Sequence, residues 1–454
     1  MSEEKSIKKC GLFALYFNSS LLLRIMIALV IGSALGMICK QNLAIADSFL
    51  ISSLPQKVLD WLGESTWIGF LTPLGDLFVR LLKMIMVPII ICSLIVGTSS
   101  ISPAHLGKVG VKAIAFYALT TLLAIVIGLG CALVFSPGSG LDLSDASKAV
   151  EKAASAPSLG KILLNIIPTN PFDSIAKGEI LPIIAFCLFF GVGLAFCRDS
   201  DDARIKNSAD TVYNFFDGMS EIMFKVVRWV MQYAPIGVFA MMFVVFNKNG
   251  IEAFSSLLNV TITLYLGLAI QVFLVYCVIC MLLGISPVKF LKKVRPPMLT
   301  AFVTRSSNGT LPITMQTAED MGIPKAIYGF VLPVGATINM NGTTVYLGVC
   351  SLFIANACGI DLNGGHYLTI IITSMLAAIG TAGVPGAGAL MLLLVLESIG
   401  LKVSGNVAIA YGMILGIDAI LDMGRTSMNV TGDVVASIYV AKSENEMDMS
   451  KWES

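Results

Sequence analysis

The hydrophobic positions of this 454-residue chain fall into long runs that are separated by short polar stretches. A run of about 20 apolar residues is long enough to cross the hydrocarbon core of a bilayer as a helix. The apolar segments before residue 290 are 21–39, 77–98, 113–135, 180–197, 210–246 with a break at Pro235, and 254–288. This pattern predicts an all-α polytopic membrane protein.

The apolar segments after residue 295 are interrupted by Gly, Pro, Ser, Thr and Asn, most densely at 304–312, 333–343 and 378–388. Broken backbone at membrane depth is tolerated only where protein buries it or where it lines a cavity. Two short apolar halves joined by a Gly-, Ser- or Pro-rich tip are typical of a re-entrant hairpin. We expect hairpins at about 289–320 and 366–399, a broken helix at about 322–358 and a last helix at about 404–441. Paired interruptions of this kind indicate a transporter-type binding site.

Composition supports the membrane assignment, because 56% of the residues are hydrophobic and only 13% are charged, against about 25% charged in a typical soluble protein. The net charge of +1 excludes a strongly basic nucleic-acid-binding protein. The polar regions are predicted to lie outside the bilayer. They are an amino-terminal cytoplasmic or interfacial segment (1–19), a loop (141–178) and a polar tail (442–454) that we expect to be solvated.

The residues that most enzymes and metal centres need are scarce. His105 and His366 are the two histidines of the chain, so a histidine metal site or Cys–His catalysis has little material. Cys277 and Cys280 form a C-x-x-C pair, but no basic residue lies nearby to lower a thiol pKa. We therefore expect structural cysteines, no catalytic residues and no organic cofactor.

One stretch of the last segment carries charge. Asp418, Asp422, Arg425 and Asp433, with Asn429 between them, are spaced four, three, four and four residues apart and share one helix face. A charge at the bilayer centre costs about 2.5–3.5 kcal/mol on insertion scales. Because of this cost, we expect charged residues inside a membrane segment to have a function. The carboxylates can bind an ammonium group or Na⁺, and Arg425 can bind a carboxylate bidentately. The alternative is an ion-pair network with a purely structural role.

A second polar feature is Asn339-Met-Asn341-Gly-Thr343, inside a charge-free run. Unwinding there would free carbonyl groups for a cation, although a kink capped by asparagine explains the same residues. The two hairpin tips would present backbone N–H groups to an anion. They also read as ordinary kinks.

Four motifs in register resemble the glutamate transporter family of dicarboxylate/amino acid:cation symporters, with prokaryotic aspartate transporters as the most similar subgroup. They are Arg-Ser-Ser-x-Gly-Thr-Leu-Pro, Asn-Met-x-Gly-Thr, Gly-Thr-Ala-Gly-Val-Pro-Gly and Asp-Met-Gly-Arg-Thr…Asn-Val-Thr-Gly-Asp. The resemblance extends over about 76–442 and is densest after residue 300.

The resemblance implies eight transmembrane helices plus two re-entrant hairpins, assembled as a homotrimer in a prokaryotic cytoplasmic membrane with both termini cytoplasmic. Residues 20–250 would form mostly the scaffold. Residues 251–441, together with the helix at about 108–135, would form a transport domain that moves like an elevator.

The resemblance also assigns residues. The substrate would be an acidic amino acid, with Arg425 on its side-chain carboxylate and Asp422 on its α-amino group. Further substrate contacts would come from Thr426, Asn429, Thr343, Ser306, Ser307, Val384 and Gly388. One sodium site would use Gly335, Asn339, Asn429 and Asp433. A second would use Thr337, Met340 and the backbone of Ala378, Ile379 and Thr381. A third would use Tyr117, Thr120, Thr121, Asn339 and position 341.

The sequence departs from the family pattern at three places. Asn341 stands where the family has an aspartate of the third sodium site, and a neutral amide lacks the charge that offsets cation desolvation. Asn308 stands where many relatives have a serine. Leu347 stands where animal carriers have a glutamate linked to proton coupling.

The sequence is thus interpreted as a symporter of L-aspartate or L-glutamate driven by a cation gradient, with Na⁺ as the coupling ion. The alternatives are a carrier of the same fold for C4-dicarboxylates or neutral amino acids, with proton or reduced sodium coupling, and an ion channel. Asp422 disfavours a dicarboxylate, which has no ammonium group to bind.

Overall fold

The computed structural model describes residues 19, 21–41, 66–99, 108–141, 143, 164, 167–381 and 383–453. In these parts of the chain the regular elements are all helices. Six helical segments are long and apolar enough to cross a membrane: Ile68–Ser99, Lys108–Phe135, Ala203–Asn247, Ile251–Leu282, Lys325–Ala357 and Gly405–Ser443. The chain is therefore an integral, multi-pass membrane protein. The amino-terminal segment 1–18 and residues 144–163 of the expected loop lie outside the described residues.

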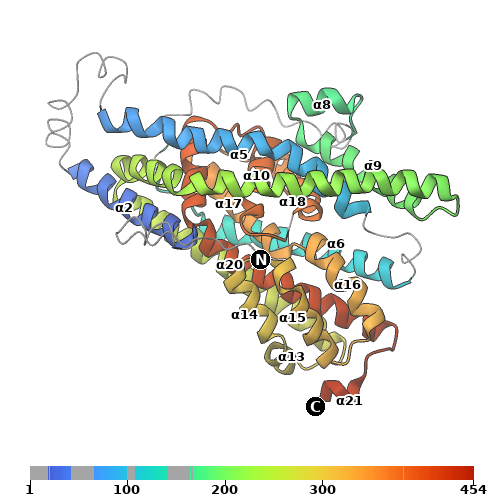
Figure 1. Cartoon of the computed structure of the whole chain (residues 1–454). Helices are drawn as coiled ribbons and strands as arrows, with labels where there is room; N and C mark the ends of the chain where they lie inside the picture. The colour runs from blue at the N-terminus through green and yellow to red at the C-terminus, as the bar shows by residue number, and fades with distance from the viewer. Residues whose placement is uncertain are drawn as a thin grey trace, which may run out of the picture.

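One group of helices comes from the first half of the chain. Helix α10 (Ala203–Asn249) packs along α2 (Leu21–Gln41) and α5 (Thr66–Ser99), and α5 also packs against α9 (Ile180–Arg198). Figure 1 shows α5 and α10 lying side by side. A short helix, α8 (Pro171–Lys177), precedes α9.

The predicted break at Pro235 is wrong, because α10 continues through this proline for its full 47 residues. Proline in a membrane helix is tolerated where neighbouring groups or local adjustments satisfy the freed carbonyl. The tight packing of α10 on α2 and α5 holds the helix together on both sides of the proline.

The second group surrounds α20 (Gly405–Ser443), which is buried along most of its length. It includes α6 (Lys108–Phe135), α11 (Ile251–Ile270), α16 (Lys325–Ile338) and α17 (Asn341–Ala357). Helix α17 packs between α6 and α20, and its central residues are all buried. A helix that is buried on every side explains why the run around it carries no charge.

Helix α11 continues through a π-helix, η3 (Gln271–Tyr276), into α12 (Cys277–Leu282). The apolar span was predicted to reach residue 288, but it ends at Leu282. Gly284 has a positive φ of 71°, and the Ser286 side chain caps α13 (Pro287–Lys293). The change of direction is therefore set by a glycine turn and an N-cap, whereas the uncharged sequence alone suggests a longer helix.

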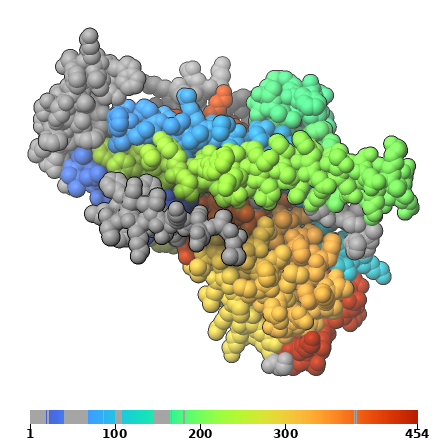
Figure 2. All heavy atoms as spheres, in the orientation of Figure 1, coloured from blue at the N-terminus to red at the C-terminus, as the bar shows by residue number. Residues whose placement is uncertain are grey.

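Two helix pairs complete the second group. Helices α14 (Arg295–Thr304) and α15 (Ser307–Asp320) are joined at a tip where Arg305 has a φ of 54°. Helices α18 (Gly364–Gly380) and α19 (Ala387–Ser398) are joined through 381–386, where Gly386 has a φ of 82°. Both pairs occupy the positions of the expected hairpins. In Figure 2 yellow and orange residues, which include the first pair and α16, lie directly below the green band of α10.

The tail contacts α13 through Trp452. Its other described residues after 441, except Met447, are exposed or half-buried, so the expectation of a solvated tail fails only at these two side chains. Helix α21 (Met449–Glu453) buries Trp452, which is 1% exposed. The ammonium groups of Lys289 and Lys293 lie 5.7 and 5.3 Å from the centroid of its ring. The Ser450 hydroxyl donates to the Asp448 carboxylate at the start of this helix and lowers its pKa from the usual range. A large aromatic ring can therefore anchor an otherwise polar segment.

Candidate functional site

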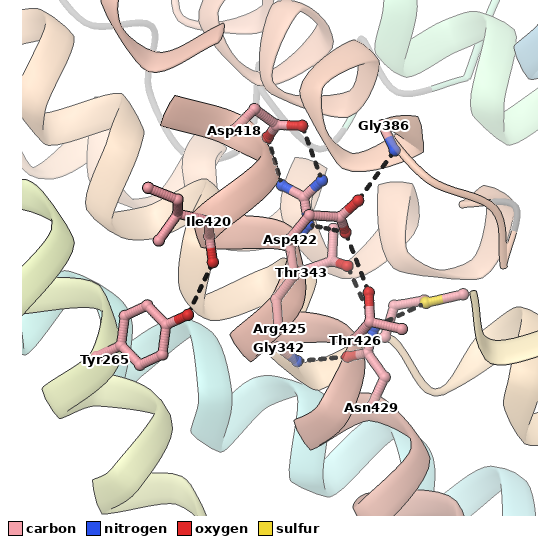
Figure 3. A network of polar contacts seen from close by, with 11 residues as sticks. Tyr265, Gly342, Thr343, Gly386, Asp418, Ile420, Asp422, Arg425, Thr426 and Asn429 are labelled. Carbon is pink, nitrogen blue, oxygen red and sulfur yellow. Dashed lines mark hydrogen bonds and ion pairs between the residues drawn. The ribbon is translucent and has the colours of Figure 1, made fainter. Parts of the chain in front are cut away.

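The charged face of α20 is buried in the middle of the second group. Asp418, Asp422, Arg425, Asn429 and Asp433 are each no more than 6% exposed. Their spacing places them along one side of the helix, as the sequence predicts. Figure 3 shows the upper part of this row facing the 383–386 loop and the start of α17. A buried row of this kind needs compensating partners.

Arg425 is the centre of an ion-pair network. Its Nη1 and Nη2 atoms donate to the two Asp418 oxygens at 3.0 and 3.4 Å, and its Nε donates to Asp422 Oδ1 at 2.9 Å. The Arg425 side chain is 1% exposed. Three of the five guanidinium N–H groups are thereby used by carboxylates of the same helix. Asp418, which the sequence left without a role, holds the planar edge of the guanidinium.

Asp422 connects α20 to the tip between α18 and α19. Its Oδ1 also accepts from Thr426 Oγ1 at 3.0 Å, and its Oδ2 accepts from the Gly386 backbone N–H at 3.1 Å. The contact of Asp422 with Gly386 was not expected from sequence, because it depends on where the tip lies. Asp422 thus links the charged face of α20 to the 383–386 loop (Figure 3).

Two further residues confine the guanidinium. The Tyr346 ring lies under it, with 4.3 Å between the ring centroid and Arg425 Cζ, and a Cβ at Gly388 would lie 2.7 Å from Cζ. Tyr346 was not among the residues expected from the sequence. Its position three residues after Thr343 on α17, hence on the same helix face, is the signal that could have found it.

The broken helix supplies the other wall. Asn339 and Met340 leave the helical conformation, with ψ of 73° and 50°, between α16 and α17. The Gly342 N–H at the start of α17 donates to Asn429 Oδ1 at 2.6 Å. Asn429 Nδ2 in turn donates to Thr343 Oγ1 at 3.3 Å and to the Met340 sulfur at 3.1 Å. A side chain at position 342 would collide with the Arg425 carbonyl, so glycine permits this close approach.

The two tips meet beside these residues. Ser306 Oγ and the Asn308 backbone N–H both donate to the Gly383 carbonyl, at 2.8 and 3.3 Å. A cavity of about 10 Å³ remains between the tips and the charged face. Its lining includes Ser307, Thr343, Val384, Gly388, Asp422, Arg425, Thr426 and Asn429. Since this is about the volume that one water molecule needs, an amino acid can enter only if the tips or the charged side chains move.

The residues of the first expected sodium site lie together. Asp433 Oδ1 accepts from Asn339 Nδ2 at 2.8 Å, and a Cβ at Gly335 would lie 2.6 Å from Asp433 Oδ1 and 3.0 Å from Tyr117 Oη. The Tyr117 hydroxyl donates to the Val331 carbonyl at 2.8 Å. Among the described residues, Asn339 Oδ1 has no hydrogen-bond donor although it is buried. An orphaned amide oxygen beside a buried carboxylate fits a hard cation, which takes oxygen ligands.

In the second expected sodium site, the two threonine hydroxyls donate to backbone carbonyls of their own segments and not to each other. Thr337 Oγ1 donates to the Val334 carbonyl at 3.0 Å, and Thr381 Oγ1 donates to the Ala377 carbonyl at 2.7 Å. Met340 and Thr381 line the same small cavity. Of the other two members, Ala378 is buried and accepts from the Thr381 backbone N–H at 3.4 Å, and Ile379 is half-buried at the end of α18.

Of the third expected set, Thr121 and Asn341 bond to uncharged partners, whereas Asn339 donates to Asp433. Thr121 Oγ1 donates to Asn341 Oδ1 at 2.8 Å, and Asn341 Nδ2 donates to Tyr276 Oη at 2.8 Å. The Thr120 hydroxyl donates to the Phe116 carbonyl, and the Thr120 carbonyl accepts from Gln271 at 3.2 Å. Both ends of the Asn341 amide therefore have uncharged partners. The π-helix supplies Tyr276 as a partner of Asn341 and Gln271 as a partner of Thr120, and the sequence identified neither.

The described residues contain no group of three or more His, Cys, Asp or Glu side chains that could hold a metal ion. In this multi-pass helical membrane protein, the buried charged face of α20 lies beside the tips of two helix pairs, α14–α15 and α18–α19. This arrangement is typical of a transporter.

Comparison with known proteins identifies the family. Residues 21–443 match the model of the Sodium:dicarboxylate symporter family. The Proton/sodium-glutamate symport protein of Bacillus subtilis (strain 168) is 36% identical over 402 residues, covering 87% of this chain and 91% of that protein. The chain belongs to the sodium:dicarboxylate symporter family. It is a transporter and not an enzyme, and the family resemblance is confirmed.

Two other relatives have different printed names. The Proton/glutamate-aspartate symporter of Escherichia coli (strain K12) is 36% identical, covering 86% of this chain and 88% of that protein. The C4-dicarboxylate transport protein of Bacillus subtilis (strain 168) is 34% identical, covering 84% of this chain and 89% of that protein. The family thus includes carriers of two substrate classes, both of them anionic.

Proposed function

We propose that this protein is a secondary symporter that carries L-aspartate or L-glutamate across the membrane, driven by a cation gradient, with Na⁺ as the coupling ion. The observation that carries the proposal is the buried Arg425 between Asp418 and Asp422, directly under the tip at Gly386. A guanidinium and a carboxylate side by side match the carboxylate and the ammonium of one zwitterionic acidic substrate.

The hydrogen bonds of Arg425 suggest how the substrate enters this site. Asp418 takes the edge between Nη1 and Nη2, and Asp422 takes Nε. A bidentate substrate carboxylate needs two parallel N–H groups, so one internal carboxylate must withdraw. If the substrate displaces Asp422 from Nε, Asp422 becomes free to accept the substrate ammonium. Asp418 then keeps the guanidinium in place throughout the exchange.

Tip movement follows from the same exchange. When Asp422 turns to the ammonium, its bond to the Gly386 N–H breaks or lengthens, and the 383–386 loop can reclose over the loaded site. Thr426, Asn429, Thr343, Ser306, Ser307, Val384 and Gly388 are proposed as the remaining substrate contacts. A partly loaded site would leave unpaired charge in the membrane, which opposes movement across the bilayer.

Cation binding is proposed at Asp433, Asn339, Asn429 and Gly335, and around Thr337, Met340, Ala378, Ile379 and Thr381. The orphaned Asn339 Oδ1 supports the first of these sites. At the third family position the uncharged partners of Asn341 support the loss of that cation, because the oxygen and the nitrogen of the Asn341 amide are both hydrogen-bonded without one.

The proposed mechanism is an elevator movement of the second group of helices, with α6, against the first group. Eight membrane-crossing helices, two re-entrant hairpins, a homotrimer and cytoplasmic termini are part of this proposal. The grouping supports it, since α17 packs on α6 and α20 while α10 packs on α2 and α5.

A C4-dicarboxylate is the second candidate substrate, because a relative of 34% identity is named for such transport. Asp422 argues against it, since a dicarboxylate brings no positive charge to offset a buried carboxylate. The test is uptake of labelled aspartate, glutamate, succinate and serine into proteoliposomes, with Na⁺ and H⁺ gradients imposed separately. We expect Na⁺-driven uptake of aspartate or glutamate. Uptake of succinate or serine in preference to both would refute the substrate assignment, and uptake indifferent to Na⁺ would refute the cation sites.

A further inference from the structure

A cavity of about 360 Å³ lies between the two groups of helices, next to the substrate site but far larger than it. One wall comes from the first group, with Leu21 and Ile25 of α2, Phe78 of α5 and Val238 of α10. The opposite wall is the 384–386 loop with parts of α19 and α20. Pockets that hold small organic ligands start at about 300 Å³. The cavity is therefore large enough to bind a ligand.

The lining is apolar over most of its area. Thirteen of the eighteen lining residues are Leu, Ile, Val, Phe, Met, Ala or Pro. Apolar cavities hold water poorly, because a buried water molecule needs two to four polar partners. In a membrane protein the apolar molecules in contact with the surface are lipid chains. This cavity therefore favours a hydrocarbon chain over water.

The polar residues are at two places in the lining. Arg305 and Asp418 are opposite charges and can offset one another at the tip. Arg228 is exposed, so the cavity reaches the surface there. In the part of the chain that the structure describes, no ion pair joins Arg228 to a carboxylate. The lining residue Gln232 accepts from Arg24 Nη1 at 3.2 Å, which adds a second cation near this rim.

We propose that the cavity binds an acyl chain of an anionic membrane phospholipid, with the lipid phosphate at Arg228. The apolar walls fit the chain, and the two arginines at the rim complement the charge of the headgroup. Leu23, next to Arg24 on α2, and Trp229, next to Arg228 on α10, have exposed apolar side chains. Such a surface suits contact with lipid, from which a chain can enter between the two helices.

A bound chain would act on the substrate site through the 384–386 loop. This loop lines the cavity with Val384, Pro385 and Gly386, and the Gly386 N–H donates to Asp422. Any outward movement of the loop needs the space that the chain occupies. This part of the inference rests on the proposed function: the lipid slows opening of the loop and hence substrate exchange.

Binding of the lipid is tested by an experiment that does not depend on substrate transport. The full-length protein is reconstituted with a phosphatidylglycerol that carries a photoactivatable diazirine in its acyl chain, and labelled peptides are identified by mass spectrometry. We expect label on 224–238 and 384–389. Val238→Trp should reduce it about tenfold, because Val238 lines the cavity and the indole would take up part of the space that the acyl chain needs. Ala234→Phe is the second variant if the first does not fold.

A charge variant separates the headgroup from the chain. Arg228→Gln should reduce the preference for phosphatidylglycerol over phosphatidylcholine about fivefold, the contribution of one basic residue at an anionic surface. Label spread evenly over all lipid-facing helices, or unchanged by both filling variants, would overturn the proposal. So would stronger labelling by a diazirine fatty acid without a phosphate headgroup.

Uptake provides the separate readout for regulation. Val238→Trp should exchange labelled aspartate faster than the unmodified protein when both are in phosphatidylglycerol vesicles. If the variant loses the label but exchanges aspartate at the same rate, the lipid site stands and the proposed effect of the lipid on substrate exchange is refuted. If the unmodified protein does not take up acidic amino acids at all, the proposed function fails, whereas the labelling result stands by itself.

Discussion

Replacing Arg425 by lysine isolates the forked geometry of the guanidinium from its charge. In the structure, three N–H groups on three different nitrogen atoms of Arg425 contact Asp418 and Asp422. A lysine ammonium carries its three donors on one atom and cannot span both carboxylates and a substrate carboxylate. The variant keeps one positive charge in the site. Its defect should therefore be one of geometry and of incomplete pairing.

The size of the defect follows from the burial of the site. Arg425 is 1% exposed, and truncating one partner of a buried charge pair costs about 2–5 kcal/mol. At about 1.36 kcal/mol per tenfold change in rate, kcat/KM for aspartate should fall about 30- to 5,000-fold. Serine has no side-chain carboxylate, so its uptake or its competition with aspartate should change by less than about threefold on the same scale.

The assay is uptake of labelled aspartate and serine into proteoliposomes, with the amount of folded protein checked by size-exclusion profile and thermal melting. The matched control is Arg204→Lys. Arg204 is exposed near the start of α10, outside the site, and among the described residues no ion pair joins it to a carboxylate, so this change should have little effect. If aspartate and serine lose uptake equally, Arg425 is a structural residue. If aspartate uptake falls less than about threefold, the carboxylate assignment is wrong.

Three further changes test other parts of the structure. Asn341→Asp introduces a carboxylate next to the uncharged partners of Asn341 and should raise the number of Na⁺ ions that move with each substrate, measured as the flux ratio of labelled sodium and aspartate; an unchanged ratio contradicts the account of the third site. Gly388→Ala places a methyl group 2.7 Å from the guanidinium carbon and should lower aspartate kcat/KM at least about tenfold. Gly193→Ala, where nothing lies within 4 Å, is its control and should have no effect. Trp452→Ala removes the anchor of the tail at a loss of about 3 kcal/mol, so tryptic cleavage within 444–453 should accelerate about 100-fold. The exposed Lys292→Ala serves as control, and equal cleavage of both variants would mean that the ring does not hold the tail.

Much of the local structure follows from the sequence because the membrane imposes strict rules. Apolar runs must form helices, since unpaired backbone groups are costly in lipid. The asparagines at 339 and 341 mark the place where α16 ends and α17 begins. The four- and three-residue steps from Asp418 to Asp433 put these charges on one helix face before any contact is known. These features depend on neighbours along the chain or on the solvent.

Other features could not be read from spacing. Pro235 looks like a helix break, but packing against α2 and α5 keeps α10 continuous. Trp452 lies in a polar tail, but its ring packs against two lysines of α13. From the sequence, Asn341 shows only that the aspartate of the family's third sodium site is absent. Its partners Thr121 and Tyr276 come from helices 220 and 65 residues away.

The charged face shows the division most clearly. The spacing of these residues along the chain is enough to predict that they share a helix face and that, once buried, they need partners. The packing of distant segments is needed to show that Arg425 donates to both Asp418 and Asp422, and that Asp422 accepts from the Gly386 N–H. Spacing along a helix sets only the direction of a side chain, whereas a hydrogen bond needs an approach within about 3 Å. That approach depends on how distant segments of the chain pack.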